Sequence, residues 1–391
     1  MRKNKAAFLL LLALLVIIAG GCGMAAPSAG TVEGSKGDGP IIIGHIAALS
    51  GDNAAWGQSE KKALEMMVNN INADGGVLDR ELKLISYDNG GDQTGAFTAA
   101  NRLANDGALA VIGPSQSNLS ITAAQVFEEA GIVMISTTGT NDQLTVPAGH
   151  SQPLRYIFRT NFTDADQAEK AALFAVEYLN VGKAGILKDS SSDYSLNLTA
   201  YFEQAFAEKG GVITANESFQ AGDPELTGQL SRIKESGAQL LFIPTFPTEG
   251  KLVIKQAKEL AMDCFFLGGD AWAGQQLQGI DSEIMEGSFF VNISKNEDSA
   301  MAHWIDSYSK YWEEEPMMPN GALAADALYL IIEGIKETEG ADAGRLADWI
   351  AGSRDIQVLT GVITMNPDTH SPLNRQMVIE TIAQGQYTAL Y

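Results

Sequence analysis

Short apolar runs rich in β-branched residues recur along the chain, and polar or glycine-containing segments separate them. Seven runs have the length and composition of buried β-strands: 41–43, 82–85, 110–112, 132–135, 184–187, 240–243 and 289–291. Between them, apolar residues recur at the helical spacing of three and four, as at Leu226, Leu230 and Ile233. Strands that alternate with helices in this way predict parallel sheets covered by helices on both faces.

The boundaries of these elements divide the chain into larger blocks. Gly75-Gly76 and Gly210-Gly211 are expected just after helix ends, and Asp223-Pro224 is expected at the first turn of a helix. The strand–helix rhythm fills two blocks, roughly 41–160 and 183–293, and a stretch of helices and strands closes the chain. Because the chain is longer than a domain with a single hydrophobic core usually is, the pattern predicts two doubly wound α/β lobes.

The first 39 residues have no such pattern. Three basic residues precede an unbroken apolar run at 6–18, which is shorter than the about 20 residues of a membrane span. Ala19-Gly20-Gly21-Cys22 resembles a bacterial lipobox, so we expect 1–21 to be a signal peptide and Cys22 to be lipidated; the alternative is ordinary cleavage beside an unmodified cysteine. The stretch 22–39 is rich in glycine, alanine, serine and proline, which predicts a flexible tether. The expected location is the outer face of the cytoplasmic membrane.

Charge and cysteine content narrow the class of partner. The net charge is −22, and it becomes −25 without residues 1–21, which carry three basic residues and no acidic ones. Nucleic acid is therefore an unfavourable partner. A lipidated Cys22 leaves Cys264 as the remaining thiol, so no internal disulfide can form. Cys264 begins an apolar run, which predicts a buried, unreactive side chain.

Sequence motifs for catalysis and for cofactors are missing. The chain has no phosphate loop, no dinucleotide fingerprint, no His-Glu-x-x-His and no Gly-x-Ser-x-Gly. Its histidines lie far apart in sequence and are expected to be surface or packing residues: His45, His150, His303 and His370. Asp88-Asn89-Gly90-Gly91-Asp92 follows a strand and is typical of a turn. We therefore expect no catalytic residues, no bound metal and no cofactor.

Small polar residues gather where strands are expected to end. Ile112-Gly113-Pro114-Ser115-Gln116-Ser117 leads from a strand into a helix, where a ligand carboxylate can bind the Ser117 hydroxyl and free backbone amides. Ser136-Thr137-Thr138-Gly139-Thr140-Asn141 ends the next strand. Ordinary helix capping explains these serines and threonines equally well. Asp270, after a later strand, can neutralise an ammonium group.

An ordered series of segments from about Pro40 onward matches one known family. The segments are Ile46-Ala47-Ala48-Leu49-Ser50-Gly51, Trp56-Gly57, Ile71-Asn72-Ala73-Asp74-Gly75-Gly76-Val77, Tyr87-Asp88, Val111-Ile112-Gly113-Pro114, Gly131-Ile132-Val133-Met134-Ile135-Ser136, Thr140-Asn141, Ala324-Ala325-Asp326-Ala327-Leu328 and Leu359-Thr360-Gly361. Through them the chain resembles the leucine/isoleucine/valine-binding proteins, type I periplasmic binding proteins that feed ABC importers.

The resemblance implies two lobes joined by a hinge. Lobe one is expected to contain residues 41–163 and 294–362, and lobe two residues 164–293 and 363–391. Three crossovers, near residues 163, 293 and 362, are expected to form the hinge. Ligand contacts to both lobes would favour a closed state.

The resemblance also implies a set of ligand-binding residues. The family's carboxylate-binding serine falls on Ser117, its carbonyl and threonine contacts on Thr138 and Thr140, and its acidic ammonium partner on Asp270. The aromatic wall of the side-chain pocket falls on Trp56. The second-lobe aromatics fall on two further residues, Tyr194 and Phe246.

Four positions depart from the family pattern. Asp270 is shorter than the usual glutamate, which leaves room for Trp272 to shape the pocket. Ser195 stands at the place of a glycine. Gly91 and Gln116 stand where some relatives have a disulfide.

The resemblance implies a monomer that captures a small amino acid, branched-chain or related, by lobe closure and delivers it to the permease of an ABC importer. Other ligands remain open on the same fold, namely amides, urea or aromatic acids. A sensor that docks on a receptor ectodomain is a second class of function. An extracellular enzyme is the third class and the least favoured.

Overall fold

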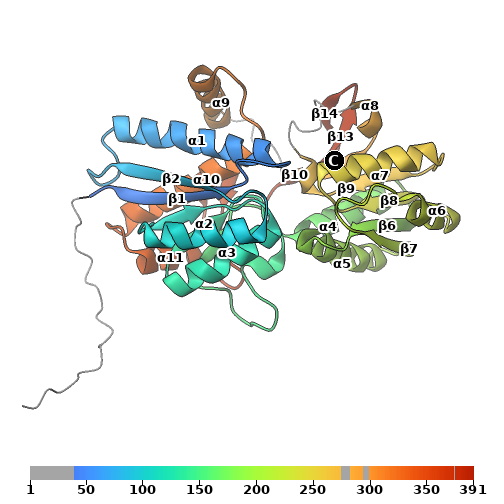
Figure 1. Cartoon of the computed structure of the whole chain (residues 1–391), viewed down its shortest axis with the longest axis horizontal. Helices are drawn as coiled ribbons and strands as arrows, with labels where there is room; N and C mark the ends of the chain where they lie inside the picture. The colour runs from blue at the N-terminus through green and yellow to red at the C-terminus, as the bar shows by residue number, and fades with distance from the viewer. Residues whose placement is uncertain (1–38, 274–281, 294–298, 374) are drawn as a thin grey trace, which may run out of the picture. The chain divides into compact units, whose positions relative to one another are not determined.

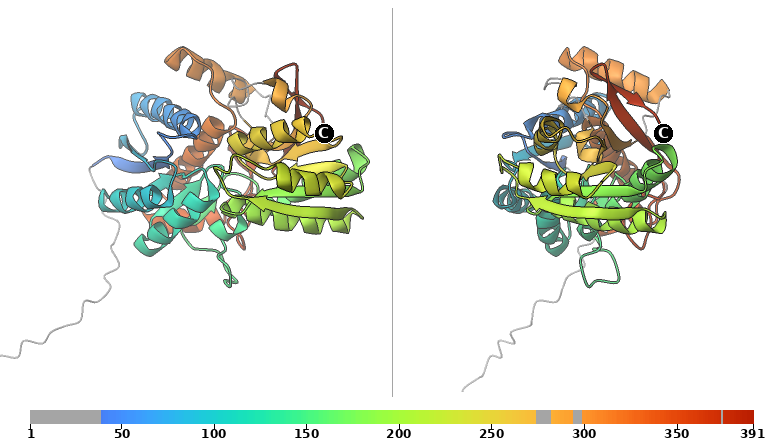
Figure 2. Two further views of the ribbon diagram at one scale, coloured as in Figure 1. Left: turned by 45° about the vertical axis from the view of Figure 1, so that its right-hand side comes forward. Right: turned by 90° about the vertical axis from the view of Figure 1, so that its right-hand side faces the viewer.

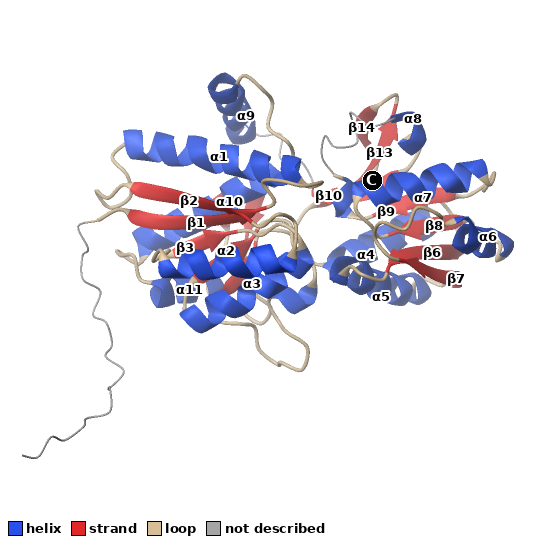
Figure 3. Cartoon of the chain, in the orientation of Figure 1, coloured by secondary structure: helices blue, strands red, loops and turns tan. Residues whose placement is uncertain are grey.

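Two open β-sheets organise the part of the chain that the computed structural model describes, residues 39–273, 282–293, 299–373 and 375–391. Helices cover both faces of each sheet (Figures 1 and 3). The predicted signal peptide, Cys22 and all but the end of the predicted tether lie outside the described residues. No helix in the described ranges is both long and apolar enough to cross a membrane.

The first sheet has the strand order β2-β1-β3-β4-β5, and every neighbouring pair is parallel. Its strands are β1 (Ile41–Ala47), β2 (Leu82–Asp88), β3 (Ala110–Ile112), β4 (Val133–Ser136) and β5 (Ile157–Arg159). The helices around it are α1 (Ala54–Ala73), α2 (Gln93–Asn105), α3 (Ser117–Ala130), α9 (Ser299–Trp312), α10 (Asn320–Glu337) and α11 (Ala343–Ala351).

Alternate residues of the first sheet pack on opposite helical layers. In β3 and β4, Ile112 and Val133 pack with α1 and α10, whereas Val111 and Met134 pack with α2 and α3. The views of Figure 2 show the sheet between these layers. Burial on both faces explains why these strands appear in the sequence as continuous apolar runs.

The second sheet has the order β14-β13-β10-β9-β8-β6-β7 and is parallel from β10 to β7. Its parallel strands are β6 (Lys183–Asp189), β7 (Val212–Phe219), β8 (Leu240–Ile243), β9 (Phe265–Gly268) and β10 (Phe289–Ile293). Two antiparallel strands, β13 (Met377–Ala383) and β14 (Gln386–Ala389), complete one edge. The helices around this sheet are α4 (Asp164–Leu173), α5 (Asp193–Glu208), α6 (Thr227–Glu235), α7 (Pro247–Glu259) and the short α8 (Ser282–Met285).

All seven strands predicted from apolar runs are present, and the predicted fold class is confirmed below by similar structures. Both glycine pairs follow helix ends as predicted, since α1 ends at Ala73 and α5 at Glu208. The strand β7 did not appear as an apolar run because it is an edge strand in which most side chains are partly exposed.

The helix predicted to begin at Asp223-Pro224 begins three residues later, at Thr227, so this prediction is wrong. The Asp223 carboxylate accepts the Gln220 N–H at 2.9 Å, and the Pro224 carbonyl accepts from the Gln256 side chain at 2.9 Å. These bonds hold the Asp-Pro segment as a loop against α7.

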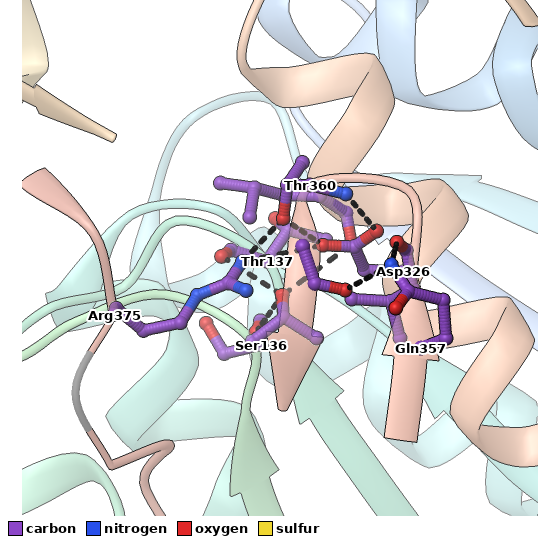
Figure 4. Close-up of polar contacts among 10 residues, drawn as sticks. Ser136, Thr137, Asp326, Gln357, Thr360 and Arg375 are labelled. Carbon is purple, nitrogen blue, oxygen red and sulfur yellow. Dashed lines mark hydrogen bonds and ion pairs between the residues drawn. The ribbon is translucent and has the colours of Figure 1, made fainter. Parts of the chain in front are cut away.

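The chain passes between the elements of the two sheets three times, after β5, after β10 and after the hairpin of β11 (Ile356–Val358) and β12 (Gly361–Ile363). A buried polar cluster marks the last passage (Figure 4). Arg375 Nη2 donates to Asp326 Oδ2 at 3.2 Å and to Thr360 Oγ1 at 2.5 Å, while Thr360 donates its N–H and its hydroxyl to Asp326. Because a buried charge is stable only when paired, this cluster ties α10 to the segment that enters β13.

Candidate ligand-binding site

One cavity, whose empty space of about 410 Å³ includes open solvent, lies among loops and helix starts that follow strands of both sheets. All seven residues predicted to bind a ligand line it: Trp56, Ser117, Thr138, Thr140, Tyr194, Phe246 and Asp270. Its other lining residues are Ser115, Gln116, Ala271, Ala273, Pro319 and Asn320.

The β3–α3 segment places Ser117 and backbone amides at the cavity. Gly113 has a φ of +84°, and a Cβ there would lie 2.3 Å from the Ile46 carbonyl oxygen, so glycine allows this turn to pass close to β1. Ser117 is the first residue of α3, and its Oγ accepts the Asn141 N–H at 3.3 Å. The Ser117 hydroxyl hydrogen therefore remains able to donate. The first turn of α3 also presents backbone N–H groups and the positive end of the helix dipole.

Helix capping does not explain the serines and threonines of these loops. The N-cap of α3 is Gln116, whose side chain makes no capping hydrogen bond. The hydroxyls of Ser120 and Ser136 instead donate to the Pro114 carbonyl, and Thr138 donates to the Ser115 carbonyl at 3.0 Å. These bonds tie the β3–α3 and β4 loops together on one side of the cavity.

A buried carboxylate beneath the two loops was not found from the sequence. Glu60 of α1 is fully buried, and its Oε1 accepts from the hydroxyls of Ser115 at 2.9 Å and Thr137 at 2.6 Å. Its Oε2 lies 3.5 Å from His45 Nε2. His45 is thus a buried packing residue, one of the two roles expected for the histidines. Glu60 holds the backbone from which Ser117 and Thr138 project.

A second buried charge, Arg159, orients the loop after β4. Its Nη1 donates to the Gly139 carbonyl at 3.0 Å and its Nη2 donates to the Asn141 carbonyl at 2.7 Å. Burial lowers the pKa of Arg159, and the nearby carboxylate of Asp142 opposes that shift. Thr140, held between these two carbonyls, accepts the Asp164 N–H on its own carbonyl at 2.9 Å.

Asp270 begins the short helical turn Asp270–Trp272 after β9 and faces the cavity. Asn161 Nδ2 donates to its Oδ2 at 3.2 Å, and the Asp270 N–H donates to Gln167 Oε1 at 3.1 Å. The Asp270 Oδ1 is buried and has no hydrogen-bond partner. Burial raises the pKa of Asp270 to about 6, and hydrogen bonds to the carboxylate limit the shift.

Three aromatic rings form a continuous wall of the cavity. Phe246, the residue that precedes α7, lies 5.8 Å from the ring of Trp56 and 5.7 Å from the ring of Tyr194, measured between centroids. Both distances are typical of favourable aromatic pairs. Gly269 makes room for this wall, because a Cβ there would lie 2.2 Å from the Tyr194 hydroxyl oxygen.

Trp272 does not shape the cavity, contrary to expectation. Its indole is fully buried in the core between the sheet and α7, and its Nε1 donates to the Thr245 carbonyl at 2.9 Å. Gly250 and Gly268 leave the space for the ring, since a Cβ on either would lie within 2.8 Å of it. The neighbouring Ala271 and Ala273 line the cavity instead.

Residues 40–386 match the sequence pattern of a family described as periplasmic binding protein. The chain belongs to this family. The family consists of solute-binding proteins, which confirms the resemblance seen in the sequence.

Similar proteins agree in sequence and in fold. Leu/Ile/Val-binding protein BraC3 of Rhizobium johnstonii is 28% identical over 328 residues, which cover 83% of this chain and 87% of that protein. The isoleucine complex of the branched-chain amino acid transporter substrate binding protein LivJ from Streptococcus pneumoniae is 26% identical, with a TM-score of 0.80 over 90% of this chain and 98% of that one. The structural similarity confirms the predicted fold class of two doubly wound α/β lobes.

The same fold also carries a different ligand. A solute-binding protein of an ABC transporter from R. palustris, in complex with benzoate, has a TM-score of 0.77 over 90% of this chain and 96% of that one. Its identity of 16% makes it a likeness of fold alone. The ligand of this periplasmic binding protein must therefore be argued from its own cavity.

The acidic residues of the predicted turn at 88–92 have structural roles. Asp88 accepts from the Leu49 N–H, the Ser50 hydroxyl and the Gly90 N–H, and Asp92 caps α2 through the Gly95 N–H. The predicted turn at 88–92 is thus present. No group of three or more histidine, cysteine, aspartate or glutamate side chains suited to a metal occurs among the described residues.

Cys264 is half-buried rather than buried. Burial raises the pKa of its thiol to about 11. The side chain therefore stays a thiol near neutral pH, which agrees with the unreactive character expected of it.

Proposed function

We propose that this periplasmic binding protein is exported, anchored to the membrane through lipidated Cys22, and captures a free amino acid, branched-chain or related, for an ABC importer. The observation that carries the proposal is the unpaired Oδ1 of Asp270, a buried carboxylate oxygen on the wall of the cavity. A buried carboxylate oxygen without a partner is costly, and a ligand ammonium supplies the missing charge and donors.

The opposite side of the cavity offers partners for the ligand carboxylate. The hydroxyl of Ser117 is free to donate, and the amides that open α3 add further donors. Thr138 and Thr140 complete this side. A ligand with an anionic group and a cationic group satisfies Ser117 and Asp270 together, and its side chain would contact Trp56 and Phe246.

Binding would hold two lobes together. The proposed lobes are residues 41–163 with 294–362, and residues 164–293 with 363–391. Hydrogen bonds already join them, from Asn141 Nδ2 to the Asp193 carbonyl at 2.9 Å and from Asn161 to Asp270. A ligand that contacts both lobes adds to these bonds only in the closed state, so it shifts the equilibrium toward closure.

The carboxylate of Asp270 also distinguishes the amino acid from the other candidate ligands. An aromatic acid suits the ring wall but brings no cation, so Oδ1 of Asp270 would stay unpaired in its complex. Urea and simple amides can donate to Asp270 but offer no anion to Ser117. A sensor would bind the same ligand and differ in its membrane partner, which an uptake assay with the reconstituted importer separates from transport.

A thermal-shift screen tests the proposal. The purified protein is heated with each of the common L-amino acids, urea, acetamide and benzoate. We expect at least one amino acid to raise the unfolding temperature, because a ligand at 100 times its Kd stabilises the folded state by about 2.7 kcal/mol. Stabilisation by benzoate or urea alone, with no response to any amino acid, would refute it.

A further inference from the structure

Asn320 is a polar residue on the wall of the ligand cavity, and the proposed carboxylate and ammonium contacts leave it without a role. It is the first residue of α10 and is 3% exposed. Its side chain does not cap the helix, and no hydrogen bond joins that side chain to another described residue. Because buried amides are almost always hydrogen-bonded in native proteins, Asn320 indicates a polar partner inside the cavity.

Asn320 reaches the cavity from the side of α1. The Ser59 hydroxyl of α1 donates to the Met317 carbonyl at 3.2 Å, so the segment before α10 is tied to α1 about one turn after Trp56. Gly321 allows the two helices to approach closely, because a Cβ there would lie 3.0 Å from Ser59 Oγ. Trp56 belongs to the aromatic wall along which the ligand side chain is proposed to lie. Asn320 therefore belongs to the same end of the cavity.

We propose that Asn320 determines specificity, and that it selects an amino acid with an uncharged hydroxyl or carboxamide side chain over one with an aliphatic side chain of the same shape. This inference rests on the proposed amino-acid site, and it departs from the branched-chain ligands named for the relatives. The amide of asparagine offers two N–H donors and one oxygen acceptor, so it can pair with either polar group.

Other side chains suit this end of the cavity less well. An aliphatic side chain would leave the Asn320 amide without a partner. A charged side chain would need an opposite charge, because burial of an unpaired charge is costly. Asp270 is the one charged residue among the described residues that line the cavity, and it is assigned to the ammonium group. A site built to hydrogen-bond a polar group strongly rejects the analogue that lacks it.

Calorimetry on the purified full chain tests this inference with two pairs of ligands of matched shape. L-threonine carries a hydroxyl where L-valine carries a methyl group, and L-asparagine carries a carboxamide where L-leucine carries an isopropyl group. In at least one pair we expect the polar member to bind at least about tenfold more tightly, which corresponds to about one net hydrogen bond. Equal binding within both pairs, as expected if water pairs with Asn320 in every complex, would overturn the inference, and so would tighter binding of both aliphatic members.

Asn320→Leu keeps the shape of the side chain and removes its donors and its acceptor. In the pair that shows a preference, the ratio of the two affinities should fall at least about tenfold. A purely structural role would weaken both members alike and leave the ratio unchanged. Asn320→Ala removes the same polar atoms without filling the cavity and should lower the ratio as well.

Asn105→Leu, at the exposed end of α2, is the matched control and should keep the ratio of the unmodified protein. An unchanged ratio in both Asn320 variants would overturn the role of Asn320. No binding of any amino acid to the unmodified protein would instead refute the proposed function.

Discussion

Replacement of Asp270 by asparagine changes the group on which the proposed site depends while preserving its shape. In the unliganded protein, Asn161 Nδ2 donates to Oδ2 of the carboxylate at 3.2 Å, and Oδ1 has no partner in hydrogen-bond geometry, although the Tyr194 hydroxyl lies near the carboxylate. Truncation of one partner of a buried charge pair costs about 2–5 kcal/mol. Asp270 is ionised at pH 7.5, above its pKa of about 6, and Asn161 already donates to it, so we expect a loss within that range, about 3 kcal/mol.

The measurement is isothermal titration calorimetry at pH 7.5 with the amino acid that stabilises the protein most. Asp270→Asn should raise Kd by about 100-fold. It should not lower the unfolding temperature of the unliganded protein, since it removes a buried, unpaired charge. Asp263→Asn, at an exposed aspartate before β9, is the control. A Kd within threefold of the unmodified protein would show that no ammonium group binds at Asp270.

Three further predictions follow from other contacts. Burial raises the pKa of unliganded Asp270 to about 6, and a ligand ammonium would lower it, so the affinity for the ligand should fall about tenfold at pH 5 relative to pH 7.5. The fall should be absent in Asp270→Asn. Equal affinity of the unmodified protein at both pH values in calorimetry would contradict this. Arg375→Met should lower the free energy of unfolding by about 3–5 kcal/mol in urea titration, because it leaves a buried carboxylate unpaired, whereas a loss below 1 kcal/mol would refute the stabilising role of the cluster. Gly250→Ala should lower the free energy of unfolding by about 1–3 kcal/mol, since its Cβ would lie 2.7 Å from the Trp272 ring. Gly228→Ala on α6, where the nearest atom would lie at 3.8 Å, should leave it unchanged. Equal changes in the unfolding temperature of the two variants would contradict the packing argument.

The fold could be predicted because most of the buried strands are short apolar runs and the helices between them have apolar residues at intervals of three and four. The site could be predicted in part because parallel strands bring their carboxyl ends to one edge, so Ser117, Thr138 and Asp270 follow strands and line one cavity. Trp56 and Tyr194 were predicted only from the resemblance to the family, because they lie within helices and no nearby sequence pattern marks them as ligand contacts.

The supporting residues could not be predicted because their roles depend on contacts distant in sequence. Glu60 and Arg159 are ordinary charged residues until the fold buries them under the loops that they hold. Trp272 follows Asp270 by two residues, yet its side chain points into the core, because Gly250 and Gly268 leave space for the indole ring there.

The central claim is that one ligand presents an ammonium group to Asp270 and a carboxylate to Ser117. Calorimetry with three compounds that share one side chain tests it most directly: the amino acid that stabilises the protein most, the same acid without its amine, and its amine without the carboxyl group. Loss of either charged group should weaken binding by about 100-fold, as expected for about 3 kcal/mol at each end. Binding of the deaminated acid as tightly as the amino acid would contradict the account.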